Sequence, residues 1–448
     1  MKGRVTNLTE GSIWKQVLLF SLPLLMSNIL QQLYSAVDLI IIGYFYGGIE
    51  MSSIGATGSI VNMIISLFVG LSTGCAVVVS QYYGADDYEN LQNSIHTAYA
   101  ISIIGGLILT VLGVSTSHFF LKLMGTPNEI LNHSVSYMKI SFVGSVPLII
   151  YNMGSGILRS VGDSRRPFYF LIISTLTNLV LDILFAWIFD WGVAGAAWAT
   201  IISQTMSAIL VSVSLMKAHT IYHLNLKKIK LHAKAFKQII EIGVPAGIQS
   251  MLINFSNVLI QSKVNTFGSI AVGGVAAATK LDNIVASVFN SFSLSATTFS
   301  GQNLGARLKA RLKRGAKEIS LLTFISTLGI GMLIFFLRYP LVSLFTQDQE
   351  IIQVGARMVS FLTPFYWILG LVNTLGGYIR GTGESFKPML ISMFGMCLFR
   401  LVYLYVALDI KNELDILFLC YPISWTVTFV VMFIYFNKGA WRKQISSL

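Results

Sequence analysis

Charge is scarce in this sequence, and long polar stretches are absent. Only 11% of the residues are Asp, Glu, Lys or Arg, whereas soluble domains carry about 25%. Hydrophobic residues make up 54% of the chain, and its longest polar stretches, of about 15 to 20 residues, are too short to form a core of their own. The composition excludes a separate soluble domain and predicts an all-α polytopic membrane protein.

Cysteine and the usual enzyme motifs are also sparse. The chain has three cysteines in apolar runs at unrelated spacings, which predicts small buried residues rather than a disulfide or a metal centre. It lacks a paired Asp-rich magnesium motif, an HExxH sequence, a Gly-rich phosphate loop and a re-entrant segment typical of a channel filter. We expect no cofactor, and these absences disfavour a membrane transferase or a channel.

Twelve apolar runs are each long enough to cross a bilayer, which takes roughly 20 helical residues. They cover residues 16–43, 52–81, 95–116, 138–160, 167–189, 192–216, 237–263, 270–302, 318–338, 356–379, 388–408 and 413–437. The polar start of the chain lacks the apolar core and cleavage site of a signal peptide, so we expect the first run to remain as a transmembrane helix.

The basic residues, which give a formal net charge of +12, alternate with these spans. With the N-terminus placed in the cytoplasm, 23 of the 31 Lys and Arg residues lie in cytoplasmic segments, six lie outside, and Lys280 and Arg400 lie within spans. This bias follows the positive-inside rule and predicts that both termini are cytoplasmic. Because topology explains the charge, we expect no nucleic-acid partner.

An internal repeat relates the two halves of the chain. GILRSVGDSRRP (156–167) returns as GYIRGTGESFKP (377–388), SQYYGA (80–85) as GQNLGA (301–306), and Pro23 as Pro245. Each copy has six spans, an even number, so a pseudo-twofold axis along the membrane normal is expected to relate two six-helix repeats. We predict an N-terminal lobe (1–216) with the ion site, a basic cytoplasmic linker (217–236) and a C-terminal lobe (237–448).

The repeated Gly-, Arg- and Pro-containing motif at 156–167 and 377–388 is interpreted as part of the fold. Its glycines permit a tight turn, its proline begins the next helix, and its arginine and acid can pair across the turn. Because both halves carry the motif, we do not assign it a chemical role.

Two carboxylates of the first repeat fall inside predicted spans. Asp38 is followed by four apolar residues in LPLLMSNILQQLYSAVDLIIIG (22–43), and Asp182 lies four residues after Asn178, on the same helical face. An ionisable group at this depth costs a few kcal/mol or more, so it indicates an ion or substrate pathway. Without cations beside them, two such acids are poor candidates for satisfied core groups.

The second repeat lacks these polar groups. Ile260 takes the place of Asp38, and Phe399 and Tyr403 take the places of Asn178 and Asp182, so the scaffold does not require the acids. Two acids in one poorly hydrated pocket can form an oxygen cage for Na⁺ with amide and hydroxyl groups, or they can carry a proton, because burial favours the neutral carboxyl. The residues leave both possibilities open.

Two further polar residues of the first repeat are weaker candidates. Thr200 can supply a hydroxyl to the ion site, although bonding to its own helix is the commoner role of such a threonine. Asn152 can line the cavity, but it is repeated as Asn373, so packing explains it equally well.

The membrane-depth charges of the second repeat are candidate cavity or substrate residues. Lys280 and Asp282 can form a local ion pair at the cavity wall, and Arg400 can neutralise an acid of the first repeat. A structural role explains each of the three equally well.

These motifs together resemble the multidrug and toxic compound extrusion (MATE) family over essentially the whole chain. The resemblance rests on residues 22–43, the turns QYYGA and GQNLGA, the repeated RSVGDSRRP and RGTGESFKP, and NLVLD followed by GVAGAAWAT. Within the family, the chain resembles the DinF-like branch with its MepA-type bacterial exporters. The NorM-like branch instead has an essential acid about eight residues past the proline of helix seven, where this chain has Ile253.

The resemblance implies a V-shaped, alternating-access transporter whose N-lobe cation site consists of Asp38, Asn178 and Asp182, with Thr200 as a further ligand; the first three bind a metal ion only if Na⁺ is the coupling ion. We therefore predict an antiporter that exports amphipathic, cationic drugs or metabolites in exchange for Na⁺ or H⁺. We expect a monomer in a bacterial plasma membrane, with organic cations, the coupling ion and the lipid bilayer as its partners.

One alternative within the same superfamily is a flippase for lipids or lipid-linked oligosaccharides. Such a protein needs several cationic residues along its cavity to bind a pyrophosphate, and this sequence offers only Lys280 and Arg400.

Overall fold

The computed structural model describes residues 6–218 and 221–442, and every regular element in this part of the chain is helical. The elements up to the linker are α1 (Ile13–Tyr46), α2 (Gly48–Gly84), α3 (Tyr88–Leu123), α4 (Asn128–Val143), α5 (Ser145–Ser160), α6 (Arg165–Ile183), the π-helix η1 (Leu184–Ile188), α7 (Gly192–Met216) and the 3₁₀-helix η2 (Leu226–Lys228). The remaining elements are α8 (Ala233–Asn265), α9 (Ser269–Gly305), α10 (Lys309–Phe336), α11 (Arg338–Ser343), α12 (Gln349–Leu362), the 3₁₀-helix η3 (Thr363–Phe365), α13 (Tyr366–Gly381), α14 (Phe386–Ser392), the π-helix η4 (Met393–Phe399), α15 (Arg400–Ile410) and α16 (Leu414–Lys438).

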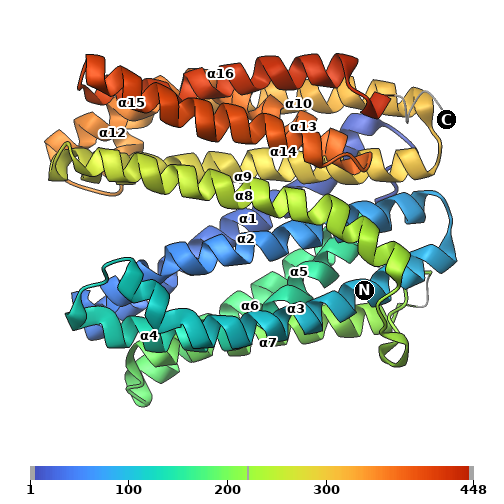
Figure 1. The fold of residues 1–448 in the computed structure, drawn as a ribbon, viewed down its shortest axis with the longest axis horizontal. Helices are drawn as coiled ribbons and strands as arrows, with labels where there is room; N and C mark the ends of the chain where they lie inside the picture. The colour runs from blue at the N-terminus through green and yellow to red at the C-terminus, as the bar shows by residue number, and fades with distance from the viewer. Residues whose placement is uncertain (1–5, 219–220, 443–448) are drawn as a thin grey trace. The chain divides into compact units, whose positions relative to one another are not determined.

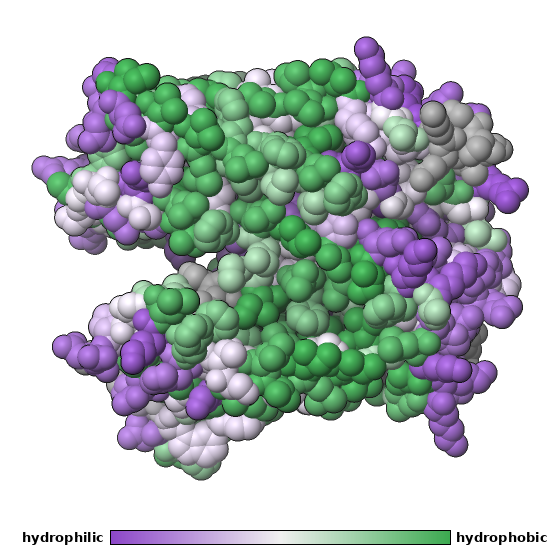
Figure 2. Space-filling model, viewed as in Figure 1, coloured by the Kyte–Doolittle hydropathy of each residue, from purple (hydrophilic) through white to green (hydrophobic). Residues whose placement is uncertain are grey.

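The helices agree with the twelve predicted spans. In the described chain, eleven helical stretches are long and apolar enough to cross a membrane. The pair α4 and α5, bent by 47° at Gly144, makes the twelfth when it is counted as one span. Large apolar side chains stay exposed at mid-helix, such as Val111 on α3 at 65%. Figure 2 shows apolar side chains over the middle of the helices and hydrophilic ones toward their ends, as expected for surfaces that face lipid.

The chain forms two compact units whose limits fall inside helices. Unit 1 contains Thr6 and residues 26–247, and unit 2 contains residues 7–25 and 248 onward. The start of α1 therefore belongs to unit 2 and the start of α8 to unit 1, with Pro23 and Pro245 each two residues before the change. The units thus differ from the predicted lobes at these two segments, because a continuous apolar helix gives no compositional signal of such a boundary.

The start of α1 and the start of α8, the two segments exchanged between the units, each make close contacts within the unit to which they belong. In unit 2, Asn303 Nδ2 and Arg311 Nε donate to the carbonyl oxygen of Leu8, at 3.1 Å each. In unit 1, α8 crosses α2 at glycines, and a Cβ added at Gly70 would lie 2.2 Å from the backbone nitrogen of Gly247. Only the absence of a side chain permits this approach.

Backbone geometry and side-chain bonds repeat between the units, as the duplication predicts. Gly162 and Gly383 hold the same place in the two copies of the repeated motif and have φ of 92° and 98°, a conformation that favours glycine at these turns. In unit 1, Ser72 Oγ donates to the carbonyl oxygen of Asn152 at 2.7 Å, and in unit 2 Ser293 Oγ donates to that of Asn373 at 2.9 Å. Figure 1 shows α10, α13 and α16 running alongside one another within unit 2.

The pairing expected in the repeated motif differs from the observed contacts. Asp163 forms an ion pair of 3.1 Å with Arg166 and accepts hydrogen bonds from the first backbone N–H groups of α6, so it caps that helix. In the second copy, Arg380 Nη2 donates to Gln249 Oε1 at 3.1 Å. The acid therefore stabilises the start of the next helix, because it lies closer to that helix end than to the arginine of the preceding one.

Part of the predicted linker at 217–236 packs on unit 1, and its last residues already belong to α8. Helix α8 already begins at Ala233. Asn225 donates its backbone N–H to His96 Nε2 on α3 at 3.2 Å, and the side chains of Tyr222 and Leu224 are buried in the core of unit 1. The lysines of this segment stay exposed, and so do Leu226, Leu231 and Phe236, so only part of its apolar surface packs on the unit.

Candidate ion-binding site

The sequence-predicted acids come together in unit 1. Asp38 lies on α1, and Asn178 and Asp182 lie one helical turn apart on α6, each of these two with only 2% of its surface exposed. The carboxyl groups of Asp38 and Asp182 are close enough to interact, and the amide of Asn178 lies beside Asp182. Spacing and resemblance predict that these residues are neighbours, and the structure brings them within range of one another.

These buried polar atoms have unused bonding capacity. Both carboxyl oxygens of Asp182, Oδ1 of Asp38 and Nδ2 of Asn178 make no hydrogen bond of ordinary geometry to other described residues. No Lys or Arg of the described chain forms an ion pair with either acid. Burying an unpaired polar group costs about 1 to 3 kcal/mol and more if it is charged, so this cluster favours an occupant that supplies positive charge.

Hydroxyl groups surround the acids. Tyr34, one turn before Asp38, has its hydroxyl 3.4 Å from Ser203 Oγ and close to Thr200 on α7. Tyr137 on α4 also lies near both acids. The four helices α1, α4, α6 and α7 thus bring oxygen atoms close to the two acids. Oxygen atoms are the ligands that a hard cation such as Na⁺ prefers, and a carboxylate can also take up a proton.

Local helix geometry fixes these side chains. The π-helix η1 begins two residues after Asp182, and one-turn π segments are frequent at functional sites. Tyr46, at the end of α1, donates its hydroxyl to the carbonyl oxygen of Ala186 in η1 at 3.1 Å and accepts from the N–H of Gly192 at 3.0 Å. The Tyr46 hydroxyl therefore ties the helix of Asp38 to the segment that follows Asp182.

The pocket is suited to a small cation or a proton rather than to a transition metal. In the described residues, no group of three or more His, Cys, Asp or Glu side chains could hold a metal ion. Two carboxylates, one amide oxygen and hydroxyls are hard ligands, which Na⁺ accepts, and a carboxyl pair can equally share one proton.

Unit 2 contains a different buried cluster around Asp282. The side chain of Asp282 on α9 lies near the Tyr366 hydroxyl and near the Arg400 guanidinium, although the two charges form no direct ion pair. Arg400 has 3% of its surface exposed, donates through Nε to Ser424 Oγ at 2.8 Å and has its Cζ 4.9 Å from the ring centre of Tyr421. Unit 2 therefore supplies a cation to its own buried acid.

The structure bears on two hypotheses from the sequence, the Lys280–Asp282 ion pair and the role of Asn152. Lys280 is exposed and forms no ion pair with Asp282 in the described chain, because residues two apart on a helix point to different faces. Asn152 Nδ2 donates to the carbonyl oxygen of Leu148 at 2.9 Å, and Asn373 makes the same bond to Leu369 at 2.9 Å. This repetition agrees with the packing explanation for Asn152.

Sequence reasoning did not single out Tyr34, Tyr137 and Ser203. The first lies four residues before Asp38 and the last three residues after Thr200, so helical spacing from the candidates contained the signal for both. Tyr137 approaches from another helix, and no local pattern marks it.

Comparison with known proteins places the chain in a family. The MatE family model matches residues 23–184 and again residues 245–406, so the first match begins at Pro23 and the second at Pro245. The chain belongs to the MatE family. This confirms the resemblance to the multidrug and toxic compound extrusion family and the duplication that pairs these two prolines.

Several proteins resemble this MatE member along most of their length. The "Probable multidrug resistance protein YoeA" of Bacillus subtilis is 27% identical over 450 residues, covering 98% of this chain and 97% of its own. The "Multidrug export protein MepA" of Staphylococcus aureus strain MSSA476 is 22% identical over 378 residues, covering 84% and 83%. A solved structure described as the outward-facing conformation of a multidrug resistance MATE family transporter is 21% identical, has a TM-score of 0.90 and covers 100% of this chain and 99% of its own, which shows the shared fold.

Proposed function

We propose that this MatE protein is a secondary active antiporter that exports amphipathic cationic compounds in exchange for inward Na⁺ or H⁺. The observation that carries the proposal is the pair of facing acids, Asp38 and Asp182, which lie at membrane depth without a cation or a full set of hydrogen bonds among the described residues. The similarity to YoeA, a probable multidrug resistance protein, and to MepA, a multidrug export protein, supports multidrug export.

The negative charge of Asp38 and Asp182 explains how an ion could drive a conformational change. With both acids ionised, the pocket holds two negative charges in a region of low dielectric constant, and their repulsion opposes close approach. A proton or Na⁺ taken up between Asp38 and Asp182 relieves this repulsion and allows α1 and α6 to come together. Release of the ion reverses the change, so occupancy and helix position are coupled.

A cationic cargo fits the same logic. A positive charge on the exported compound can compensate the acids when the coupling ion has left, so ion and cargo favour opposite states of the pocket. A neutral or anionic compound lacks this means of exchange. We therefore propose amphipathic cations as the substrate class.

The proposed setting is the bacterial plasma membrane, with both termini in the cytoplasm and the protein acting as a monomer. The excess of 23 cytoplasmic over six external basic residues supports this orientation. It places the linker between α7 and α8 on the cytoplasmic side.

The experiment is uptake of a fluorescent cationic dye by proteoliposomes under an imposed Na⁺ gradient and, separately, an imposed pH gradient. We expect one gradient to drive transport, and Asp38→Asn and Asp182→Asn to abolish it while both variants still reconstitute. Asp282→Asn, which removes a buried acid from unit 2, is the matched control and should retain transport. Unchanged gradient-driven transport in both unit 1 variants would refute the proposal.

A further inference from the structure

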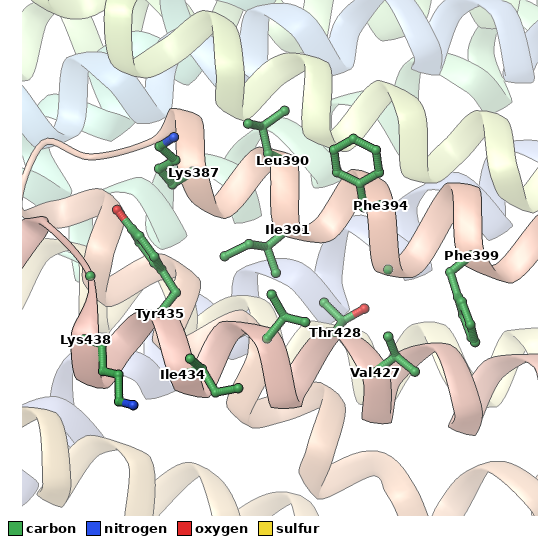
Figure 3. Close-up of a pocket in the computed structure, with 13 residues that line it drawn as sticks. Lys387, Leu390, Ile391, Phe394, Phe399, Val427, Thr428, Ile434, Tyr435 and Lys438 are labelled. Carbon is green, nitrogen blue, oxygen red and sulfur yellow. The ribbon is translucent and has the colours of Figure 1, made fainter.

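A groove lies on the outside of unit 2, between α14 with η4 on one side and α16 on the other. It has a volume of about 790 Å³. Leu390, Ile391 and Phe394 form one wall, and Val427 and Ile434 belong to the other (Figure 3). Val431, on the same helix as Val427, also lines the groove. The two walls touch at the floor, where a Cβ added at the η4 glycine, Gly395, would lie 2.1 Å from Thr428 Oγ1.

The groove has one polar end and one apolar end. Lys387 and Lys438 lie at the same end, with Tyr435 beside them, and Phe399 lies at the opposite end (Figure 3). Of the described residues that line the groove, only the two lysines are charged. Both come from segments that the proposed orientation places at the cytoplasmic surface, so the groove runs from that surface toward the bilayer centre.

The length of the groove matches one leaflet. Lys387 and Phe399 are twelve residues apart along α14 and η4, and Val427 and Lys438 are eleven apart along α16, which at about 1.5 Å per residue gives roughly 17 Å. Half of a hydrocarbon core of about 30 Å is about 15 Å. A lipid with its headgroup at the lysines would therefore place its acyl chain along the whole groove.

The polar end offers unused donors. Neither lysine forms an ion pair with an acid of the described chain, and the Tyr435 hydroxyl is buried without a hydrogen-bond partner among described residues. Glu384, which lies nearby, accepts the backbone N–H of Lys387 at 3.2 Å and so caps α14. Figure 3 shows the two ammonium groups on opposite sides of this end with Tyr435 between them, so they flank an anionic headgroup with positive charge and the tyrosine adds one hydroxyl donor.

We propose that this groove binds an anionic phospholipid of the cytoplasmic leaflet, with its phosphate at Lys387, Lys438 and Tyr435 and an acyl chain between α14 and α16. The proposal depends on the proposed membrane orientation and not on the ion-coupling mechanism. A basic groove at the cytoplasmic ends of transmembrane helices is a recognised mode of anionic lipid binding.

A neighbouring groove on the other side of α16 provides a comparison. It has about 750 Å³ and is lined by Lys313, Lys317 and Arg442, but along α10 it extends only from Leu312 to Ser320, or about 12 Å. It is therefore shorter than one leaflet, and the Tyr378 hydroxyl within it already donates to the carbonyl oxygen of Leu312. This groove has more charge but less room for an acyl chain.

The test is native mass spectrometry of the purified full chain with phosphatidylglycerol and phosphatidylcholine of identical acyl chains. We expect the wild type to retain phosphatidylglycerol preferentially, and Lys387→Gln/Lys438→Gln to lower its affinity roughly 10- to 30-fold while phosphatidylcholine binding is unchanged. Val431→Trp, which fills the groove from an exposed position, should reduce binding of phosphatidylglycerol with both lysines present.

The matched control is Lys313→Gln/Lys317→Gln, which removes the same charge from the neighbouring groove and should leave the preference intact. The proposal is overturned if the wild type shows no preference, if Lys387→Gln/Lys438→Gln retains it, or if the control loses as much affinity. Since the readout is lipid binding, a failure here leaves the antiport proposal standing, and a failure of dye transport leaves this result unaffected.

Discussion

In unit 1, two buried acids face each other with no cation of the described chain beside them, whereas in unit 2 the buried Asp282 lies near Arg400 and Tyr366. Both clusters adjoin a π-helix, η1 after Asp182 and η4 before Arg400. The same architectural feature therefore accompanies an acid pair without a nearby cation in unit 1 and an acid with Arg400 nearby in unit 2. Asp282 Oδ1 and the Tyr366 hydroxyl also lack a hydrogen-bond partner among the described residues. The ion dependence proposed above therefore rests on the acids of unit 1.

The repeat makes this difference sharper. Tyr421 and Ser424, which contact Arg400, hold the places in the second repeat that Thr200 and Ser203 hold in the first, where they lie beside the Tyr34 hydroxyl near the acids. Equivalent positions thus surround a cation in one unit and carboxylates in the other. The two copies of the repeat therefore carry buried charges of opposite sign at this place, a cation in unit 2 and two acids in unit 1.

The largest expected effect is a difference in transport between loss of the unit 1 acid Asp182 and loss of the unit 2 acid Asp282. Asp182→Asn should abolish gradient-driven transport, because it removes a group that no other described residue can replace, whereas Asp282→Asn should keep at least half of the wild-type rate. Initial rates of dye uptake in proteoliposomes, normalised to reconstituted protein, provide the measurement. Equal loss in both variants would mean that the units do not differ in the way described above.

The next effect concerns the countercharge in unit 2. Arg400→Gln removes the cation near Asp282 and should lower stability, since an unsatisfied buried polar group costs about 1 to 3 kcal/mol. The double variant Asp282→Asn/Arg400→Gln should recover part of this loss. Thermal unfolding in detergent measures it, with the exposed Lys280→Gln as the control. Strictly additive losses would show that the two residues do not interact.

A smaller effect compares the tyrosines of the two clusters. Tyr34→Phe removes a hydroxyl from the acid pocket and should weaken apparent ion affinity about fivefold, the equivalent of one hydrogen bond of about 1 kcal/mol. Tyr366→Phe should leave ion affinity unchanged and affect only stability. The measurement is transport rate as a function of ion concentration; a shift in the Tyr366 variant alone would reverse the assignment.

The smallest effect tests the asparagines that the units share. Asn152→Ala and Asn373→Ala each remove one bond to the preceding helical turn and should each cost about 1 kcal/mol of stability. Neither should change the ion dependence of transport. If Asn152→Ala alone alters it, Asn152 belongs to the cavity after all.

The sequence predicted the fold well because a membrane span is a local property. A run of about twenty apolar residues between polar flanks defines a helix without reference to the rest of the chain, and α7 was predicted at 192–216, which are its observed limits. The exchange of segments at Leu25 and Gly247 was not predictable in this way, since it depends on which neighbours a continuous helix contacts.

The site was predictable only where its residues share a helix or a repeat. The i, i+4 spacing of Asn178 and Asp182 identifies them as neighbours on one helical face. The second repeat lacks the acids, which indicates that the shared fold does not require them. Tyr137 lies on a different helix from either acid of unit 1, and Arg400 lies on a different helix from Asp282. Their approach depends on tertiary packing that spacing does not encode.

The central claim, that the carboxylate pair of unit 1 binds the coupling ion, is tested most directly by ion binding to the purified protein in detergent. Radioactive Na⁺ binding and proton release at fixed pH can be measured on the wild type, on Asp38→Asn/Asp182→Asn and on Asp282→Asn. We predict saturable binding of one of the two ions that disappears in the first variant and persists in the second. Saturable binding that survives loss of both unit 1 acids would contradict the account.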